Sequence, residues 1–170
     1  MTTFNPRPGD FGLTQIDGTV GRLVKIGQWL NGDGFHEWQH VFVYIGDDRL
    51  IEAAPGGARV APLSRYMTED TLAWSSDALS LTDEQRQSIV FAAIHYLGTP
   101  YSAATYFSLA TARLGIRPRW LKRLVSDTGA MICSQYVDQC YQDAGVHLFT
   151  DGRIPGDVTP GDLARRIGAA

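Results

Sequence analysis

The sequence predicts an α+β fold in which a small antiparallel sheet packs against helices. Segments rich in β-branched and aromatic residues occupy the first half of the chain, and segments with helical periodicity follow in the second half. Strands that cluster ahead of helices are typical of the α+β class. The 170 residues contain no internal repeat and no Pro/Ser-rich linker, so one domain spanning 1–170 is expected.

The strands are predicted from alternating hydrophobic patterns that are bounded by turn residues. Pro8-Gly9-Asp10 forms a turn before the first strand, and Gly46-Asp47-Asp48 separates the two members of a hairpin. Pro55-Gly56-Gly57 supplies the next turn. The expected strands are 11–15, 40–45, 49–53, 58–63 and 72–75.

The helices are predicted from apolar residues at helical spacing and from capping residues. Thr82 is a predicted N-cap, with Glu84 and Gln85 placed for capping, and Gly145 is a predicted helix stop. The expected helices are 20–30, 82–97, 106–114, 119–125, 133–144 and a short one from Asp162.

Composition excludes several classes of protein. A hydrophobic content of 44%, a charged content of 19% and a net charge of −3 are typical of a globular protein without a general affinity for nucleic acid. No stretch is long and apolar enough for a transmembrane helix, and residues 1–12 lack the pattern of a signal peptide. We therefore expect a cytoplasmic or virion-associated protein.

Cys133 is the candidate nucleophile. It begins a predicted amphipathic helix, and the positive end of a helix dipole favours the thiolate, which is the reactive form. Cys133 and Cys140 would lie ~10 Å apart on one helix, beyond the ~7 Å limit for a disulfide, so two thiols are expected. A free cysteine is often only a small buried apolar residue, so the hypothesis depends on its partners.

His40 and Glu52 are the candidate partners of this cysteine. His40 begins a strand and shares one face of it with Phe42, and Glu52 lies on the returning strand. A three-residue loop at 46–48 would pair Glu52 with Phe42 and so return it to the face of His40. A two-residue loop would place Glu52 on the opposite face. A His–Glu pair beside a cysteine would orient the imidazole and activate the thiol.

Four segments together resemble the NlpC-type papain-like cysteine hydrolases over roughly residues 8–165. In that family a histidine strand is followed, twelve positions on, by the third member of the triad, as His40 is by Glu52. The resembling segments are His40-Val41-Phe42-Val43-Tyr44-Ile45-Gly46, Leu50-Ile51-Glu52-Ala53, Leu97-Gly98-Thr99-Pro100-Tyr101 and Cys133-Ser134-Gln135-Tyr136-Val137.

The order of these segments resembles the circularly permuted, YiiX-like branch of the family. The histidine and glutamate strands precede the tyrosine and cysteine segments, whereas in the usual family they follow them. Pro160-Gly161-Asp162-Leu163 is also similar to a segment of the permuted branch. The residue before Cys133 departs from the usual family, since Ile132 stands where an aspartate is usual. The implied fold is a permuted papain-like (NlpC-type) fold.

The resemblance implies a cysteine hydrolase of the amidase or peptidase type that acts by acyl transfer through a thioester. Cys133 would be the nucleophile, His40 the general base and acid, and Glu52 the residue that orients the imidazole. Tyr101 and the backbone N–H of Cys133 would bind the oxyanion, and Ser134 and Tyr44 would line the oxyanion or substrate site. No metal and no cofactor are implied.

A rival motif overlaps the histidine strand. His36-Glu37-Trp38-Gln39-His40 matches the H-E-x-x-H pattern of zinc peptidases. That pattern needs a helix, where positions i and i+4 project to one side. Gly32 and Gly34 stand before it and a β-type run follows at Val41, so the zinc hypothesis is the least favoured.

The substrate stays open at the level of sequence. Peptide or amide bonds, such as those of cell-wall peptides, are expected first, and the alternative is a lipid or acyl-group hydrolase or acyltransferase of the same fold. A catalytically idle binding or structural module is a further alternative. The basic segment from Arg113 to Arg123 predicts either a solvated helix face or a weak contact with an anionic or lipid-like ligand.

Overall fold

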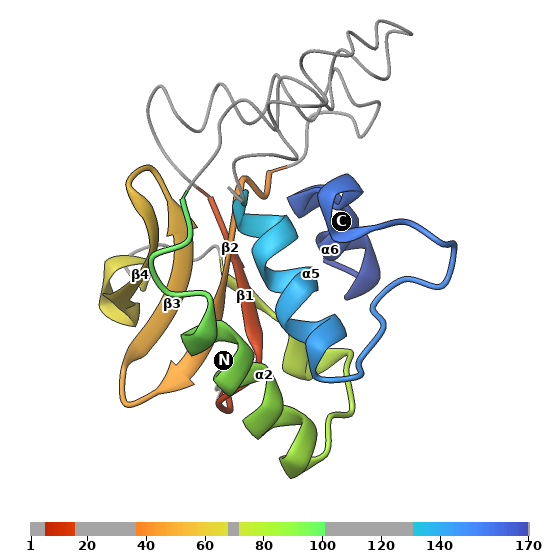
Figure 1. The fold of residues 1–170 in the computed structure, drawn as a ribbon, viewed down its shortest axis with the longest axis horizontal. Coiled ribbons are helices and arrows are strands. Elements are labelled where there is room, and N and C mark those ends of the chain that lie inside the picture. Colours follow the sequence, from red (N-terminus) through yellow and green to blue (C-terminus); the bar gives the residue numbers. More distant parts are fainter. Residues whose placement is uncertain (1–5, 16–36, 68–71, 101–130, 170) are drawn as a thin grey trace, which may run out of the picture.

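A five-stranded antiparallel sheet forms the centre of the structure (Figure 1), a computed structural model that describes residues 6–15, 37–67, 72–100 and 131–169. The strands lie in the order β4-β3-β2-β1-β5, so β2 is the central strand, and it forms a hairpin with β3. The strands are β1 (Phe11–Thr14), β2 (His40–Gly46), β3 (Arg49–Ala54), β4 (Gly57–Pro62) and β5 (Leu72–Trp74).

Three α-helices of the described chain accompany the sheet, which confirms the predicted α+β class. They are α2 (Asp83–His95), α5 (Cys133–Asp143) and α6 (Pro160–Arg166). Short 3₁₀ turns lie at η1 (Leu63–Arg65), η2 (Ser75–Asp77) and η3 (Pro155–Asp157). The helices predicted at 20–30, 106–114 and 119–125 lie outside the described residues. Within the described ranges, no helix is both long enough and apolar enough to span a membrane.

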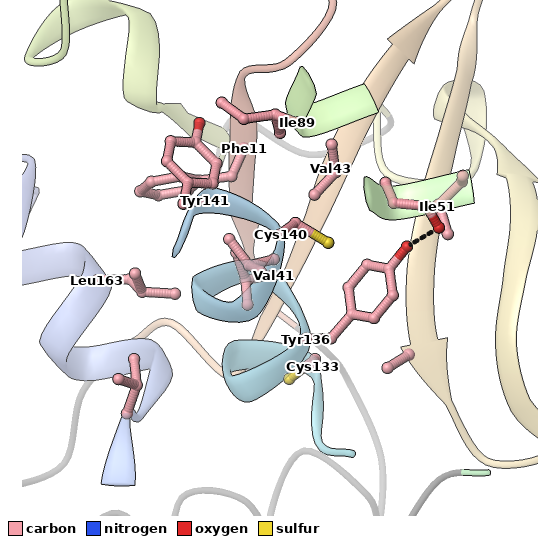
Figure 2. Close-up of a cluster of buried hydrophobic side chains, with 14 of the residues drawn as sticks. Phe11, Val41, Val43, Ile51, Ile89, Cys133, Tyr136, Cys140, Tyr141 and Leu163 are labelled. Carbon is pink, nitrogen blue, oxygen red and sulfur yellow. Dashed lines mark hydrogen bonds between the residues drawn. The ribbon is translucent and has the colours of Figure 1, made fainter. Parts of the chain in front are cut away.

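The two faces of the sheet pack into separate clusters. On one face, Val41, Val43 and Ile51 join buried side chains from α2, α5 and α6 in the main core, part of which is drawn in Figure 2. On the other face, Phe42 and Trp74 form a smaller cluster with Leu50, Ala61 and Leu63. Tyr44, Tyr66 and Leu72 pack against this second cluster. His40 follows the alternation of β2 and so belongs to the face of Phe42.

The β2–β3 hairpin differs in detail from the prediction but has the predicted register. Val43 pairs with Ile51, and Tyr44 pairs with Leu50, so the same register carried one step further sets Phe42 opposite Glu52. The loop itself contains only Asp47 and Asp48, both with positive φ, as two-residue hairpin turns require. A register shift between Tyr44 and Gly46 adds the extra residue to β2. Of the two loop lengths considered, the hairpin has the two-residue loop, and the bulge gives it the register that the three-residue loop would have given.

A buried ion pair and a hydrogen bond attach the turn before β1 to α2 and α5. Arg86 Nη1 lies 2.8 Å from Asp10 Oδ1, with side-chain exposures of 8% and 0%. The hydroxyl of Tyr141 donates to the carbonyl of Gly9 over 2.7 Å. These contacts fix the turn that begins β1, and β1 in turn pairs with β2, which carries His40.

Candidate active site

The start of β2 and the N-terminal end of α5 lie at the same end of the molecule (Figure 1). His40 is the first residue of β2, and Cys133 is the first residue of α5. The His40 side chain forms hydrogen bonds with both Cys133 and Glu52. The fold therefore brings together three of the residues that the sequence indicated: Cys133, His40 and Glu52.

The His40–Glu52 contact is short and buried. Nε2 of His40 lies 2.7 Å from Oε2 of Glu52, and the two side chains are 5% and 0% exposed. Because Nε2 is occupied by Glu52, Nδ1 is the ring nitrogen that remains for Cys133. The imidazole thus lies between a thiol and a carboxylate, which is the arrangement that activates a cysteine.

The protonated imidazole is stabilised in this environment. Burial alone would lower the pKa of His40, but hydrogen bonds and charge interactions with Cys133 and Glu52 outweigh it and raise the pKa from 6.5 to about 9. Imidazolium is therefore the form of His40 at neutral pH. An imidazolium beside a cysteine favours the thiolate.

Glu52 is buried, yet it is surrounded by hydrogen-bond donors. Arg59 Nε lies 3.0 Å and Arg65 Nη1 lies 3.2 Å from Oε1, while the Tyr66 hydroxyl donates to Oε2. Burial by itself would raise the pKa of Glu52, but His40, Tyr66 and Arg59 lower it from 4.5 to about 2. Glu52 is therefore a carboxylate throughout the ordinary pH range.

Cys133 occupies an unusual helix start. The helices α2 and α6 both begin with a threonine in a complete capping box, at Thr82 and Thr159. The N-cap of α5 is Ile132, and it supplies no side-chain hydrogen bond to the first turn. Because the cap residue provides no acceptor, the backbone N–H groups of the first turn are available to stabilise an anion.

The two cysteines differ in their surroundings. Figure 2 shows Cys133 at one end of the helix and Cys140 further along it, among labelled core side chains. Both are free and buried, with exposures of 2% and 0%. Burial raises the pKa of Cys140 to about 12, so this thiol is inert at neutral pH. Cys133 instead contacts His40.

The segment after α2 runs from the edge of the sheet to the start of α5. The N–H of Gly98 donates to Ala58 of β4, and the N–H of Ala58 donates to Thr99. The carbonyl of Pro100 then accepts a hydrogen bond of 2.9 Å from Met131, two residues before Cys133. The described part of the Leu97–Tyr101 motif therefore adjoins the cysteine segment. Tyr101 itself and the basic segment from Arg113 to Arg123 lie outside the described residues.

The other two predicted site residues have different positions. The hydroxyl of Ser134 is buried and donates to the carbonyl of Val158 over 2.6 Å, so it anchors α5. The ring of Tyr44 packs edge-on against Trp74 at 5.9 Å, within the second cluster.

Sequence reasoning missed Arg59, Arg65 and Tyr66 as neighbours of the triad. Arg59 is the direct cross-strand partner of Glu52. Pairing the predicted strands on either side of the turn at 55–57 could therefore have indicated this contact. Arg65 and Tyr66 reach Glu52 because η1 folds back after β4, and no pattern in the sequence predicts that turn.

The H-E-x-x-H segment does not have the geometry of a zinc peptidase at its described end. His40 lies in a strand and contacts Glu52, whereas the zinc motif needs a helix. His36 lies outside the described residues. In the described ranges, no group of three or more His, Cys, Asp or Glu side chains is placed to hold a metal ion.

Comparison with known proteins supports the fold. No family model and no curated protein matches the sequence. The structure is similar to the crystal structure of the metalloprotein yiiX from Escherichia coli O157:H7 (DUF1105), with a TM-score of 0.58 and 18% identity. The match covers 97% of this chain and 84% of that chain. The chain has the YiiX fold. At this identity the likeness is one of fold alone.

Proposed function

We propose that the protein is a papain-like cysteine hydrolase that acts on peptide or amide bonds through a thioester intermediate. The observation that supports this most directly is the His40 imidazole, which is hydrogen bonded to the Cys133 thiol and to the buried Glu52 carboxylate. A nucleophile, a base and a residue that orients the base are the minimum set for covalent acyl transfer.

The first half of the proposed reaction is acylation of Cys133. The Cys133 thiolate attacks the carbonyl carbon of the substrate, and the carbonyl oxygen becomes an oxyanion. The imidazolium of His40 then gives its proton to the leaving amine as the carbon–nitrogen bond breaks. A thioester and a neutral imidazole remain.

The second half is hydrolysis of the thioester. Neutral His40 takes a proton from water, which attacks the thioester carbon, and the thiolate leaves as the carboxylic acid product forms. Glu52 holds the imidazole orientation in both halves and stabilises its protonated form. Proton transfer by a positioned histidine contributes about 10²–10⁴-fold in rate.

The N-terminal end of α5 is suited to bind the oxyanion. Its cap residue Ile132 supplies no acceptor to the first-turn N–H groups, whereas Thr82 and Thr159 satisfy those of α2 and α6. A single oxyanion donor contributes about 10²–10³-fold. The tyrosine motif ends at Tyr101, which we propose as a second donor, because Pro100 hydrogen bonds to Met131.

The idle-module alternative is disfavoured by the buried charge pair. Removing water from a carboxylate is unfavourable, and Glu52 is 0% exposed. A purely structural site would be served as well by apolar side chains of similar volume. The retained Cys133, His40 and Glu52 constellation therefore favours an active enzyme.

Alkylation of the thiols tests the proposal. Wild type, Cys133→Ala, Cys140→Ala and His40→Ala would each be treated with iodoacetamide across pH 4–10, with labelled peptides identified by mass spectrometry. We expect fast labelling near neutral pH that needs Cys133 and His40 and is indifferent to Cys140. Labelling at Cys140, or labelling at Cys133 that is indifferent to His40, would overturn the proposal. Turnover of a panel of peptide amides and acyl esters would then establish the scissile bond.

A further inference from the structure

The phenol of Tyr66 shares one carboxylate oxygen with the imidazole of His40. Its hydroxyl donates to Oε2 of Glu52, and Nε2 of His40 lies 2.7 Å from the same atom. The other oxygen, Oε1, faces Arg59 and Arg65. Among the described residues, these four side chains are the polar neighbours of the carboxylate.

The position of Tyr66 is fixed on both of its sides. Its ring stacks on Phe42 of β2 with a centroid distance of 5.5 Å and an interplanar angle of 10°. It also lies 5.6 Å from the ring of His40. Its backbone N–H donates to Leu63 over 2.9 Å, and the N–H of Leu63 donates to Asp48 over 2.8 Å. The hydroxyl therefore has a defined direction toward Glu52.

A buried His–Glu pair can exist in two forms. In one, the proton is on the imidazole and the carboxylate is charged; in the other, the proton has moved to the carboxyl and both groups are neutral. Burial favours the neutral form because it disfavours charge. Only the charged form leaves an imidazolium beside Cys133. Donors on the carboxylate decide between the two forms, since hydrogen bonds to the charged group stabilise it.

We propose that Tyr66 is a positioning residue of the catalytic centre, and that its hydroxyl holds Oε2 of Glu52 against His40 and keeps the shared proton on the imidazole. This inference rests on the proposed function, because it concerns the same cysteine centre. In this role Tyr66 acts through Glu52.

Tyr66 differs from the two arginines in exposure and direction. The side chains of Arg59 and Arg65 are 48% and 47% exposed, so solvent screens their charges. They contact Oε1, whereas His40 and Tyr66 contact Oε2. Burial, followed by the hydrogen bond to Glu52, raises the pKa of Tyr66 above its ordinary value, so the phenol remains a proton donor throughout the working range.

Tyr66→Phe is the direct test, because it removes the hydroxyl and keeps the ring that stacks on Phe42. Loss of one donor to a charged carboxylate raises the pKa of Glu52, and protonation of Glu52 withdraws the charge that stabilises the imidazolium. We expect the acid limb of the Cys133 alkylation profile, measured with iodoacetamide, to move upward by about one pH unit. A residue that served packing alone would leave the profile in place.

Tyr96→Phe is the matched control. Tyr96 also donates its hydroxyl to a carboxylate, Asp143 Oδ2 at 2.7 Å, but Tyr96 caps the end of α2 and Asp143 lies at the opposite end of α5 from Cys133. We expect its alkylation profile to match wild type. An equal shift in both variants, or no shift in Tyr66→Phe, would overturn the inference.

A measurement on the unaltered protein covers the case in which Tyr66→Phe does not fold. Carbon-13 NMR of the Glu52 carboxyl should show a carboxylate over the entire range in which the His40 imidazole titrates. Titration of Glu52 within that range would overturn the inference.

The failure of the proposed function has another signature: wild-type alkylation of Cys133 that does not change in His40→Ala. His40-dependent alkylation without a Tyr66 effect would leave the hydrolase proposal in place and remove only the role of Tyr66.

Discussion

The imidazole of His40 and the carboxylate of Glu52 face each other across adjacent strands, with 2.7 Å between Nε2 and Oε2 and almost no exposure to solvent. Glu52→Gln keeps the shape of the side chain and removes its charge. We expect the pKa of His40 to fall from about 9 toward 6.5, because one of its two stabilising partners becomes neutral. Proton NMR of the imidazole measures this directly. Glu84→Gln, at the exposed start of α2, is the control, and an unchanged His40 titration in Glu52→Gln would contradict the expectation.

The same pair makes the stability of the fold depend on pH in two directions. The raised pKa of His40 stabilises the folded state fully below about 6.5, and this contribution is lost as pH rises through about 9. The lowered pKa of Glu52 stabilises the folded state above about 4.5, and this contribution is lost as pH falls toward about 2. The pair therefore stabilises the folded state most between about pH 4.5 and 6.5.

Urea unfolding at constant ionic strength checks this pH dependence. The free energy of unfolding of wild type should exceed that of a His40→Gln/Glu52→Gln double variant by its largest margin inside that window. A margin that is constant from pH 3 to pH 10 would show that the two charges do not interact in the folded state.

The buried ion pair of Asp10 and Arg86 should contribute far more to the free energy of unfolding than the exposed ion pair of Arg7 and Asp83. Asp10→Ala leaves a guanidinium that is 8% exposed without its carboxylate, which typically costs about 3–5 kcal/mol. Asp83→Ala removes an ion pair with Arg7 whose side chains are 74% and 56% exposed, and it should cost less than about 1 kcal/mol. Chemical unfolding measures the free energy of unfolding of both variants. Equal losses of stability would contradict the prediction.

Gly12 is required by the aromatic packing on the second face of the sheet. A Cβ at Gly12 would lie 2.5 Å from Cζ of Phe42 and 3.1 Å from Trp74, so the Phe42 ring must move. Gly12→Ala should lower the free energy of unfolding by about 1–3 kcal/mol. Since Tyr66 stacks on Phe42, the His40 titration should shift as well.

Gly156→Ala is the control for this substitution. Its backbone also has no positive φ, and the nearest atom to a new Cβ is 3.9 Å away. Differential scanning calorimetry and NMR of His40 would compare the two variants. A Gly12→Ala protein with wild-type stability and an unmoved His40 would disprove the packing role.

Much of the fold could be predicted from local patterns, whereas part of the site could not. The alternation after His40 and the capping residues Thr82 and Gln85 specify β2 and the start of α2 directly, and both were confirmed. These signals are local in the chain. The neighbours of Glu52 depend on how η1 folds back over the sheet, which follows from the burial of Leu63 and not from a motif around Tyr66.

The β2–β3 hairpin shows the same limit of prediction from local sequence patterns. A His–Glu pair requires a register that places Glu52 on the face of His40. The loop length and the bulge that produce this register could not be predicted. The sequence Gly46-Asp47-Asp48 suits either a three-residue loop or a two-residue turn, and the positive φ values of Asp47 and Asp48 belong to the latter. The choice depends on strand twist and on a bulge, which only the assembled sheet defines.

That bulge lets the hairpin absorb an odd change in length. Deleting Ile45 would remove the extra residue of β2, so Gly46 would still pair with Arg49, Tyr44 would pair with Leu50, and Glu52 would stay on the face of His40. Adding or removing residues in pairs would preserve the sidedness of both strands. Relatives that retain the cysteine chemistry should therefore show odd length changes in this hairpin only where a bulge is gained or lost.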